Sequence, residues 1–320
     1  MTLNETLGAN VAYVFPGQGS QAVGMGKDLY ETSAAARATF DKADAILGTP
    51  LASLAFEGPA EELNDTFNAQ PALLMTSIAA LRALDELAAA EGARVTPVVM
   101  AGHSLGEFTA LVASGALGFA ETLTLVRERG RLMREAGIAR PGGMAAVLGL
   151  DEAPLVAVCE QASARGVINV ANANCPGQIV ISGEVAALEV AMDLAKAAGA
   201  KRVTRLPVSI ASHSPLMAEA SRQLKAITDG LPIQDPRVPI VGNVSGMPIR
   251  TADELRAELE HHVERPVNWT GSVQQMIALG ADTFVELGAG NVLAGLIKRI
   301  DRAVKTVSMA DLGLGAARTG

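Results

Sequence analysis

A serine between two glycines is the clearest chemical signal in the sequence. Residues 102–106 read GHSLG, which fits the pattern G-x-S-x-G between an expected strand and an expected helix. The two glycines permit a tight turn that exposes the serine hydroxyl at the carboxyl end of the strand. The next residue opens the helix, so its backbone N–H can meet an oxyanion. The pattern predicts Ser104 as a nucleophile; the alternative is an ordinary glycine-rich turn.

A serine nucleophile needs a general base, and the chain offers four histidines: His103, His213, His261 and His262. The first adjoins the nucleophile, but neighbouring side chains diverge at a strand end. The pair at 261 and 262 lies in a charged helical run and is expected to face solvent. We therefore predict His213 as the base, the alternative being a packed or helix-capping histidine. Asp282 and Glu286 are the nearest candidates for an acidic third member, and a backbone carbonyl would orient the imidazole as well.

A second glycine-rich segment follows the first expected strand. Residues 16–21 read PGQGSQ, and Gly17, Gly19 and Ala22 also match the dinucleotide-binding fingerprint. That fingerprint requires an acidic residue about 20 positions further on, at the end of a second strand. Asp41 and Asp44 have the distance but lie in helical sequence. We favour a loop whose backbone N–H donates to an oxyanion over a nucleotide site.

Arginines are concentrated on the expected helix 119–136. They are Arg127, Arg129, Arg131 and Arg134. Because they point in several directions around the helix, most of them are expected in solvent. One that points into a cleft would bind a substrate carboxylate through two parallel hydrogen bonds.

The composition excludes several classes of protein. Of the 320 residues, 49% are hydrophobic, which excludes a disordered chain, and the net charge of -8 offers no basic face to a nucleic acid. Cys159 and Cys175 are too few for a disulfide framework and lack the spacing of a metal pair. The N-terminus does not read as a signal peptide, and polar residues interrupt the longest uncharged runs. We expect a cytoplasmic globular protein without a metal.

The order of the expected elements predicts an α/β fold. Apolar runs at 11–15, 98–101, 238–241 and 283–287 are expected strands, and the expected helices are 34–47, 71–90, one beginning near 105, 119–136 and 292–300. Strands separated by helices imply a mostly parallel sheet with helices on both faces.

The pattern changes in the middle of the chain, after the turn residues 141–143. The expected elements are then strand 144–150, helix 153–165, strand 167–171, strand 179–182, helix 185–198 and strand 202–206. This β-α-β-β-α-β order is that of a ferredoxin-like unit. We predict a large α/β domain, 1–138 and 207–320, with an inserted small domain, 139–206. The tail 311–320 is expected to be frayed.

Taken together, these motifs resemble those of the malonyl-CoA:acyl carrier protein transacylases of fatty-acid synthesis. The matching segments run nearly from end to end of the chain. They read FPGQGSQ at 15–21, QPAL at 70–73, GHSLGE at 102–107, RG at 129–130, NANCPGQ at 172–178, SH at 212–213 and GAGNVL at 288–293. The family has a hydrolase-like α/β domain with a ferredoxin-like insert, which is also the arrangement predicted from the order of the elements.

The resemblance implies a role for each matching residue. Ser104 would be the nucleophile and His213 its general base. The backbone N–H groups of Gln18 and Leu105 would form the oxyanion hole. Arg129 would bind the free carboxylate of the malonyl group.

Three asparagines complete the implied site. Asn172 and Asn174 fall where the family lines the mouth of the cleft. The backbone carbonyl of Asn268, before the tryptophan of a Pro-Val-x-Trp motif, would orient His213. Glutamine or arginine is commoner than asparagine at position 268, and proline is commoner than Ala289; both departures are expected to be benign.

The implied reaction is a ping-pong transfer of malonyl from malonyl-CoA to the phosphopantetheine thiol of an acyl carrier protein. It needs no cofactor, since malonyl-CoA is a substrate. We expect a monomer whose partners are malonyl-CoA and the holo carrier protein, with no nucleic acid or membrane. The carrier protein is acidic in the family, and Lys201, Arg202 and Arg205 are candidates for its docking patch.

Several alternatives to this reaction stay open. A serine hydrolase or thioesterase could use the same core, although it would favour an acidic triad member. A dinucleotide-binding oxidoreductase and a non-catalytic binding module are weaker options. An acyltransferase that serves a polyketide synthase would carry the same motifs. Residues 210–213, IASH, fall where related acyltransferases vary with the acyl group, and the resemblance implies malonyl rather than methylmalonyl.

Overall fold

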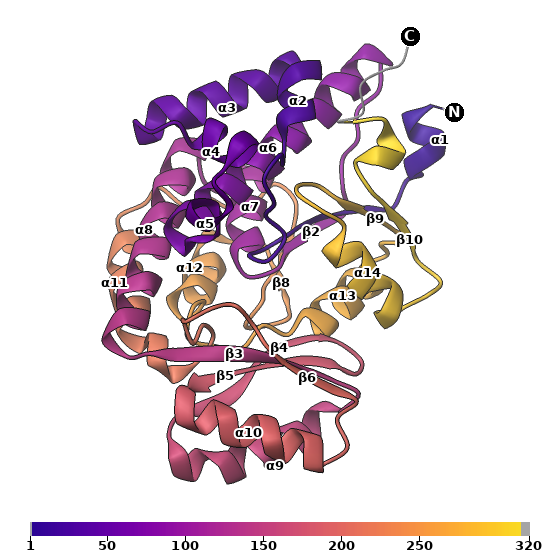
Figure 1. The fold of residues 1–320 in the computed structure, drawn as a ribbon. Coiled ribbons are helices and arrows are strands. Elements are labelled where there is room, and N and C mark those ends of the chain that lie inside the picture. Colours follow the sequence, from indigo (N-terminus) through magenta and orange to yellow (C-terminus); the bar gives the residue numbers. More distant parts are fainter. Residues whose placement is uncertain (1, 315–320) are drawn as a thin grey trace.

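The computed structural model describes residues 2–314, and a six-stranded sheet, here called the large sheet, lies at its centre (Figure 1). Its strand order is β10-β9-β1-β2-β7-β8. The strands are β1 (Val11–Phe15), β2 (Val99–Gly102), β7 (Ile240–Val241), β8 (Pro248–Ile249), β9 (Thr283–Glu286) and β10 (Lys305–Val307). Neighbours pair in parallel except β7 and β8, which are antiparallel. The predicted mostly parallel sheet is confirmed.

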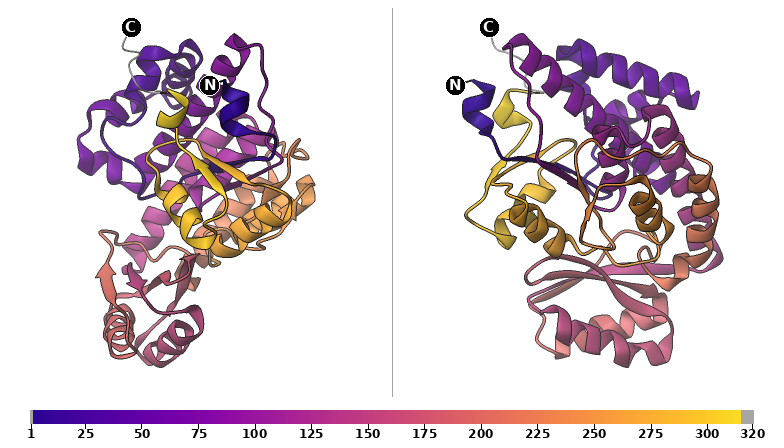
Figure 2. Two further views of the ribbon diagram at one scale, coloured as in Figure 1. Left: turned by 90° about the vertical axis from the view of Figure 1, so that its right-hand side faces the viewer. Right: turned by 180° about the vertical axis from the view of Figure 1, so that it is seen from behind.

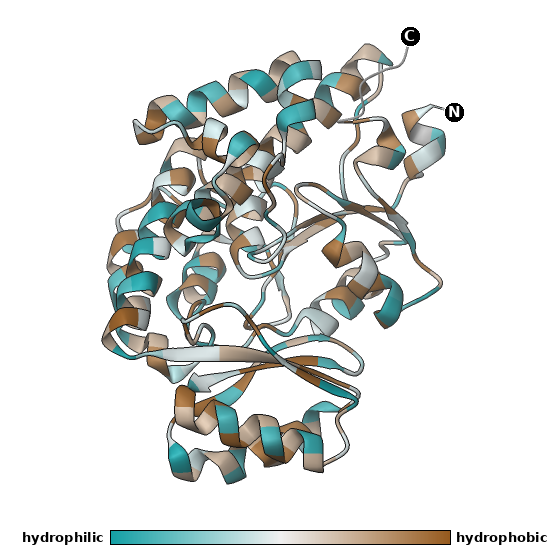
Figure 3. Cartoon of the chain, in the orientation of Figure 1, coloured by the Kyte–Doolittle hydropathy of each residue, from teal (hydrophilic) through white to brown (hydrophobic). Residues whose placement is uncertain are grey.

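Helices cover both faces of the large sheet because its central strands are apolar on both. In β1, Val11, Tyr13 and Phe15 belong to one core cluster, while Ala12 and Val14 belong to another. The first face is covered by α6 (Thr66–Ala90), α7 (Leu105–Ser114) and α8 (Phe119–Ala139), and the second by α13 (Trp269–Ala278) and α14 (Val292–Ile300). Figure 3 shows hydrophilic and hydrophobic residues alternating along the outer helices, as expected when one side of a helix is buried.

Further helices surround this core. They are α1 (Leu3–Leu7), α2 (Lys27–Thr32), α3 (Ala34–Leu47), α4 (Leu51–Glu57), α5 (Ala60–Asn64), α11 (Ala218–Asp229) and α12 (Ala252–Glu260). Helix α6 begins at Thr66, five residues before the predicted start at Pro71. The Asp65 side chain accepts a hydrogen bond from the Phe67 N–H at 2.8 Å, so Asp65 caps the helix and the proline lies inside it.

A four-stranded antiparallel sheet, here called the small sheet, has the order β4-β5-β3-β6 (Figures 1 and 2). Its elements are β3 (Gly142–Leu148), α9 (Glu152–Ala162), β4 (Ile168–Cys175), β5 (Gln178–Glu184), α10 (Val185–Ala197) and β6 (Arg202–Arg205). The two helices cover the face that looks away from the large sheet (Figure 1). The predicted ferredoxin-like order is confirmed, and the domain boundaries at 139 and 206 stay a prediction.

The end of β4 brings the two sheets into contact. This strand runs four residues beyond its predicted end at 171, with register shifts on the way. Asn172 forms a parallel bridge with Val267, which precedes α13. Residues 172–174 therefore lie beside the start of α13, a helix that covers one face of the large sheet.

The C-terminal segment is more ordered than predicted up to the last described residue. A short 3₁₀ helix, η3 (Ala310–Leu312), packs Leu312 against the main core cluster, so the expectation of fraying from residue 311 is wrong there. Residues 315–320 of that prediction lie outside the described part of the chain. Within residues 2–314, no helix has both the length and the apolarity needed to cross a bilayer.

Candidate active site

Ser104 lies in a sharp turn between β2 and α7. Its φ of 48° and ψ of -109° are unusual for a residue with a side chain, so the surrounding structure must hold it there. Two close approaches do so. A Cβ atom on Gly106 would lie 2.0 Å from the carbonyl oxygen of Phe15, and one on Gly102 would lie 1.9 Å from the carbonyl carbon of Gly106. Both glycines of the G-x-S-x-G pattern are thus required sterically.

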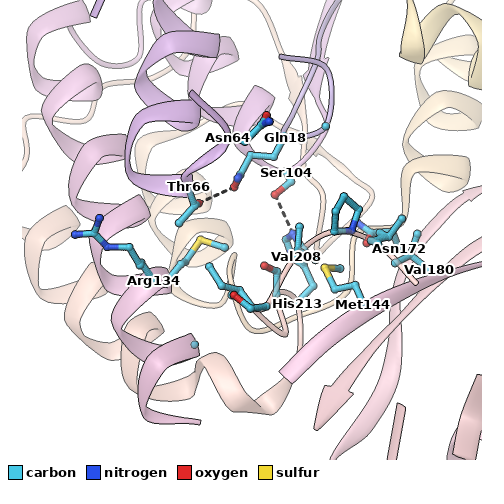
Figure 4. Close-up of a pocket in the computed structure, with 18 of the residues that line it drawn as sticks. Gln18, Asn64, Thr66, Ser104, Arg134, Met144, Asn172, Val180, Val208 and His213 are labelled. Atoms are coloured by element: carbon cyan, nitrogen blue, oxygen red, sulfur yellow. Dashed lines mark hydrogen bonds between the residues drawn. The ribbon is translucent and has the colours of Figure 1, made fainter. Parts of the chain in front are cut away.

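The Ser104 hydroxyl contacts an imidazole (Figure 4). Its Oγ lies 2.8 Å from Nε2 of His213, and Nδ1 of His213 lies 3.0 Å from the carbonyl oxygen of Arg265. Since a carbonyl only accepts, Nδ1 carries the proton and Nε2 can accept the serine proton. Burial lowers the pKa of His213 well below its ordinary value, so the ring is neutral. A neutral imidazole against a hydroxyl is suited to general-base catalysis.

The prediction that the Asn268 carbonyl orients His213 is wrong. Asn268 is the N-cap residue of α13, and its carbonyl accepts the Ser272 N–H at 3.0 Å. An N-cap carbonyl takes the first hydrogen bond of its helix, so it points along the helix axis. The carbonyl of Arg265, which precedes Pro266, contacts the ring instead.

Arg129 lies directly behind the nucleophile and is 1% exposed. Its Nη1 donates to Oε1 of Gln70 at 2.6 Å, and its Nη2 donates to Oγ of Ser104 at 3.1 Å. Its Nε is buried without a hydrogen-bond partner among the described residues. Burial lowers the pKa of Arg129 to about 9, against the opposing effect of Glu107, so the guanidinium is charged at neutral pH. A buried cation with an unused donor is suited to an anionic ligand.

The other three arginines of α8 have side-chain partners away from Ser104. Arg127 stacks on Phe67 and donates to Thr49, Arg131 pairs with Glu128 and Glu135, and Arg134 pairs with Asp65. Only Arg129 points at the nucleophile, because its position on α8 faces the core while the other three are part-exposed.

A cavity of about 630 Å³ opens in front of the Ser104–His213 pair. In Figure 4, Gln18 and Ser104 enter it from the large sheet, and Met144, Asn172 and Val180 from the small sheet. Asn174 also lines it, with Oδ1 2.8 Å from Nε2 of His103. The structure thus brings Asn172 and Asn174 to the same cavity as Ser104 and His213.

The Gln18 loop meets the Ser104 turn because β1 and β2 are neighbours. Phe15 pairs with Gly102, so both strands end side by side. A Cβ atom on Gly17 would lie 2.3 Å from the His103 carbonyl oxygen, which shows how closely the loops approach. Among the described residues, no hydrogen bond occupies the backbone N–H of Gln18 or of Leu105. Two free donors beside the hydroxyl match what an oxyanion hole requires.

Glu286 and Asp282, the candidates for an acidic third member, are engaged elsewhere. The Glu286 carboxylate accepts the N–H groups of Leu293 and Ala294, at 3.1 and 2.8 Å, at the start of α14. Asp282 accepts from the Asn10 side chain. The Arg265 carbonyl takes the place of a triad carboxylate.

The expectation that His262 faces solvent is wrong. Helix α12 ends at Glu260, so the helical pattern no longer governs the following residues, and His262 turns inward. It is 0% exposed, and its Nδ1 lies 3.5 Å from Nη2 of Arg129. Its neighbour His261 is half-exposed, with 45% of its side chain open to solvent, in line with the prediction.

Sequence reasoning missed Asn243, which follows β7. Its Oδ1 accepts the Ser104 N–H at 2.7 Å, and its Nδ2 donates to the Gly102 carbonyl at 2.6 Å. The signal was available in part, because the first polar side chain after a parallel strand lies at the edge where β2 also ends. Gln70 and Glu107 belonged to matching motifs but had no assigned role.

Comparison with known proteins places this chain among acyl transferases over most of its length. The acyl transferase domain family matches residues 12–313. A malonyl CoA-acyl carrier protein transacylase of Bacillus subtilis (strain 168) is 47% identical over 304 residues, covering 95% of this chain and 94% of the relative. That of Escherichia coli (strain K12) is 44% identical over 289 residues, covering 90% of this chain and 92% of the relative.

Solved structures agree with the sequence relatives. An acyl carrier protein S-malonyltransferase of Vibrio cholerae O1 biovar eltor str. N16961 superposes with a TM-score of 0.90 at 41% identity, covering 95% of this chain and 99% of that one. A malonyl-transacylase in complex with its type II PKS acyl-carrier protein has a TM-score of 0.90 at 39% identity, covering 96% and 97%. Since the likeness extends through both sheets and the cavity between them, the chain belongs to the family of malonyl CoA-acyl carrier protein transacylases.

Proposed function

We propose that this protein transfers the malonyl group of malonyl-CoA to the phosphopantetheine thiol of an acyl carrier protein, through a malonyl ester of Ser104. One observation carries the proposal: the Ser104 hydroxyl lies 2.8 Å from Nε2 of His213 and 3.1 Å from Nη2 of Arg129. The first contact supports nucleophilic attack. The second supplies a cation within reach of an acyl group bonded to Oγ.

In the first half-reaction, Nε2 of His213 removes the Ser104 proton as Oγ attacks the thioester carbonyl. The tetrahedral oxyanion accepts hydrogen bonds from the N–H groups of Gln18 and Leu105, and the start of α7 adds its dipole. The C–S bond then breaks, and the imidazolium returns its proton to the CoA sulfur. His213 is neutral again, and Ser104 carries the malonyl ester.

The second half-reaction uses the same groups in reverse. His213 removes the proton of the pantetheine thiol, and the sulfur attacks the ester carbonyl. The same oxyanion donors serve, and Ser104 Oγ leaves with the proton from His213. Asn172 and Asn174, at the cavity mouth, are where the pantetheine arm would pass.

Arg129 would bind the malonyl carboxylate through two parallel hydrogen bonds. Its Nε has no hydrogen-bond partner among the described residues and its Nη2 contacts Oγ of Ser104, so a carboxylate beside that oxygen would satisfy one donor that is otherwise unused. A carboxylate held there would also help to keep water from the ester, which is what separates a transferase from a hydrolase. Arg129→Ala should therefore weaken the use of malonyl-CoA far more than that of acetyl-CoA.

The carrier protein would dock beside β6. Lys201, Arg202 and Arg205 are exposed there, and the chain continues from β6 into residues 206–210, which line the cavity. A locally basic strand would attract an acidic carrier despite the net charge of -8. We infer a cytoplasmic enzyme of fatty-acid chain elongation. Because one relative is bound to a polyketide carrier protein, the test below compares carriers of both types.

Intact-protein mass spectrometry after brief exposure to malonyl-CoA tests the proposal, with Ser104→Ala as the matched control. We expect a malonyl adduct on the wild type only, which holo acyl carrier protein discharges. Carriers of fatty-acid and polyketide type, compared at equal concentration, identify the pathway by the rate of discharge. Steady release of CoA into water without an adduct would instead favour a hydrolase. No adduct and no turnover would mean that the substrate class is wrong.

A further inference from the structure

A buried polar cluster lies behind Arg129, and the steps above do not use it. His262 and Glu107 are both 0% exposed. Nδ1 of His262 lies 3.5 Å from Nη2 of Arg129, and its Nε2 lies 3.5 Å from Oε2 of Glu107. The imidazole therefore stands between a buried guanidinium and a buried carboxyl group. An arginine, a histidine and a glutamic acid buried together need a reason, because burial of such polar groups is costly.

The chemistry of the partners fixes the state of this imidazole. A guanidinium only donates, so Nδ1 of His262 must be the acceptor, and the neutral ring carries its proton on Nε2, toward Glu107. Burial, together with Arg129, lowers the pKa of His262 to about 3, which keeps the ring neutral. Among the described residues, neither Nε2 of His262 nor Oε1 of Glu107 has a hydrogen-bond partner, and the 3.5 Å between Nε2 and Oε2 is a contact only.

Packing leaves the imidazole little freedom. Its ring meets the Phe108 ring edge-on, with 5.0 Å between centroids, and the Arg129 guanidinium lies 5.3 Å from the same Phe108 centroid. Glu107 is held in turn by the backbone N–H of Asn243 at 2.9 Å. Thus each group that contacts His262 is itself fixed.

The Nη2 atom of Arg129 needs a hydrogen-bond acceptor on the side that faces His262. Gln70 holds Nη1, but among residues 2–314 Nη2 has only Ser104 Oγ and His262 as hydrogen-bond partners. When Ser104 becomes an ester, its oxygen is a poorer acceptor, and His262 remains the contact that keeps Nη2 in place. Glu107, on the other side of the imidazole, raises the pKa of Arg129, while burial raises the pKa of Glu107 itself to about 8.

We propose that His262 is a positioning residue: it accepts a hydrogen bond from Arg129, is backed by Glu107 on its other side, and so aims the guanidinium at the carboxylate of the acyl group. It acts on the selection of the acyl group rather than on proton transfer by His213. The inference rests on the proposed function, in which Arg129 binds that carboxylate.

Two substitutions of His262 test the inference, each assayed with malonyl-CoA and acetyl-CoA. His262→Leu removes both polar contacts, and we expect kcat/KM for malonyl-CoA to fall about tenfold, mainly through KM, with a much smaller loss for acetyl-CoA. His262→Gln keeps an acceptor and a donor at similar reach and should restore most of the malonyl preference. In an Arg129→Ala background, His262→Leu should cause no further fall in the malonyl:acetyl ratio.

The outcomes separate the inference from the proposed function. If Arg129→Ala leaves the ratio unchanged, the carboxylate clamp is wrong, and the inference falls with it. If Arg129→Ala lowers the ratio but His262→Leu lowers both substrates equally, only the inference is overturned, because His262 is then merely structural. Thermal unfolding checks each variant. Should the leucine variant not fold, His262→Asn, whose amide is too short to reach both partners, takes its place with the same expected fall in the ratio.

Discussion

Asn243 holds the backbone of Ser104 in the turn, from the neighbouring strand end. Its amide closes two hydrogen bonds, accepting from the Ser104 N–H at 2.7 Å and donating to the Gly102 carbonyl at 2.6 Å. The bond to Gly102 is buried and the one from Ser104 is part-buried, and together they join the two residues on either side of His103. The unusual φ of Ser104 is therefore stabilised by a side chain more than 130 residues away.

Asn243→Ala should lower kcat about 100-fold while changing KM for malonyl-CoA little. Without the amide, the Ser104 turn can relax, and a shift of about 1 Å in the nucleophile costs that much. The burst of malonyl-enzyme, followed by quenched-flow mass spectrometry, measures the effect directly. An unchanged burst rate in a folded variant would contradict the positioning role of Asn243.

Asn268→Ala is the matched asparagine control. This side chain caps α13, and its loss should cost about 1 kcal/mol of unfolding free energy. Because the Arg265 carbonyl contacts His213, kcat should stay within twofold of the wild type. A large loss of kcat without loss of stability would bring Asn268 back as the orienting residue.

Gly106→Ala should destabilise the protein by about 3 kcal/mol or more and abolish malonylation of Ser104. Its Cβ would lie 2.0 Å from the Phe15 carbonyl oxygen, a backbone atom at the end of the buried strand β1 that cannot easily move aside. Gly295→Ala, within α14, is the control, because its Cβ meets nothing within 4 Å. It should raise the unfolding free energy by about 0.5–1 kcal/mol, since glycine is unfavourable in a helix interior. Urea unfolding compares the two, and equal effects would contradict the steric argument.

The pH dependence of kcat/KM should lack an acid limb near pH 6.5, the ordinary pKa of histidine. Protonated His213 cannot accept the Ser104 proton, so activity falls as the pH drops through the pKa of the ring. Burial has moved that pKa well below its ordinary value, so the plateau should extend to correspondingly lower pH. Stopped-flow release of CoA, with circular dichroism as a check on folding, gives the profile. An acid limb at or above 6.5 would mean that water reaches the imidazole.

Glu286→Ala should leave the chemistry intact and destabilise the fold. The carboxylate satisfies two backbone N–H groups at the start of α14, and leaving them unpaired should cost about 2 kcal/mol of unfolding free energy. Chemical denaturation measures the loss, and transfer assays at 25 °C should give kcat within twofold of the wild type. A kcat that collapses in the folded variant would place Glu286 in the catalytic machinery.

The sequence by itself determined the fold class and the serine nucleophile, because both follow from patterns between residues that are close together in the chain. Apolar runs such as Val11–Phe15 and helices such as Ala34–Leu47 and Val292–Ile300 have the bounds that were predicted. The alternation of strands and helices predicts the parallel sheet. G-x-S-x-G marks the nucleophile because the turn at Ser104 leaves no room for a side chain at position 102 or 106. Elements with weak patterns, such as the two- and three-residue strands β8 and β10, were not predicted.

The tertiary structure alone decided which groups surround the nucleophile, since these contacts join segments far apart in the chain. Whether the carbonyl of Arg265 or of Asn268 faces His213 depends on where α13 begins. That His262 is buried against Arg129 depends on where α12 ends and on the space left by Phe108. A polar residue in a charged segment carries no local sign of such a position, because its environment is supplied by distant side chains rather than by its neighbours in sequence.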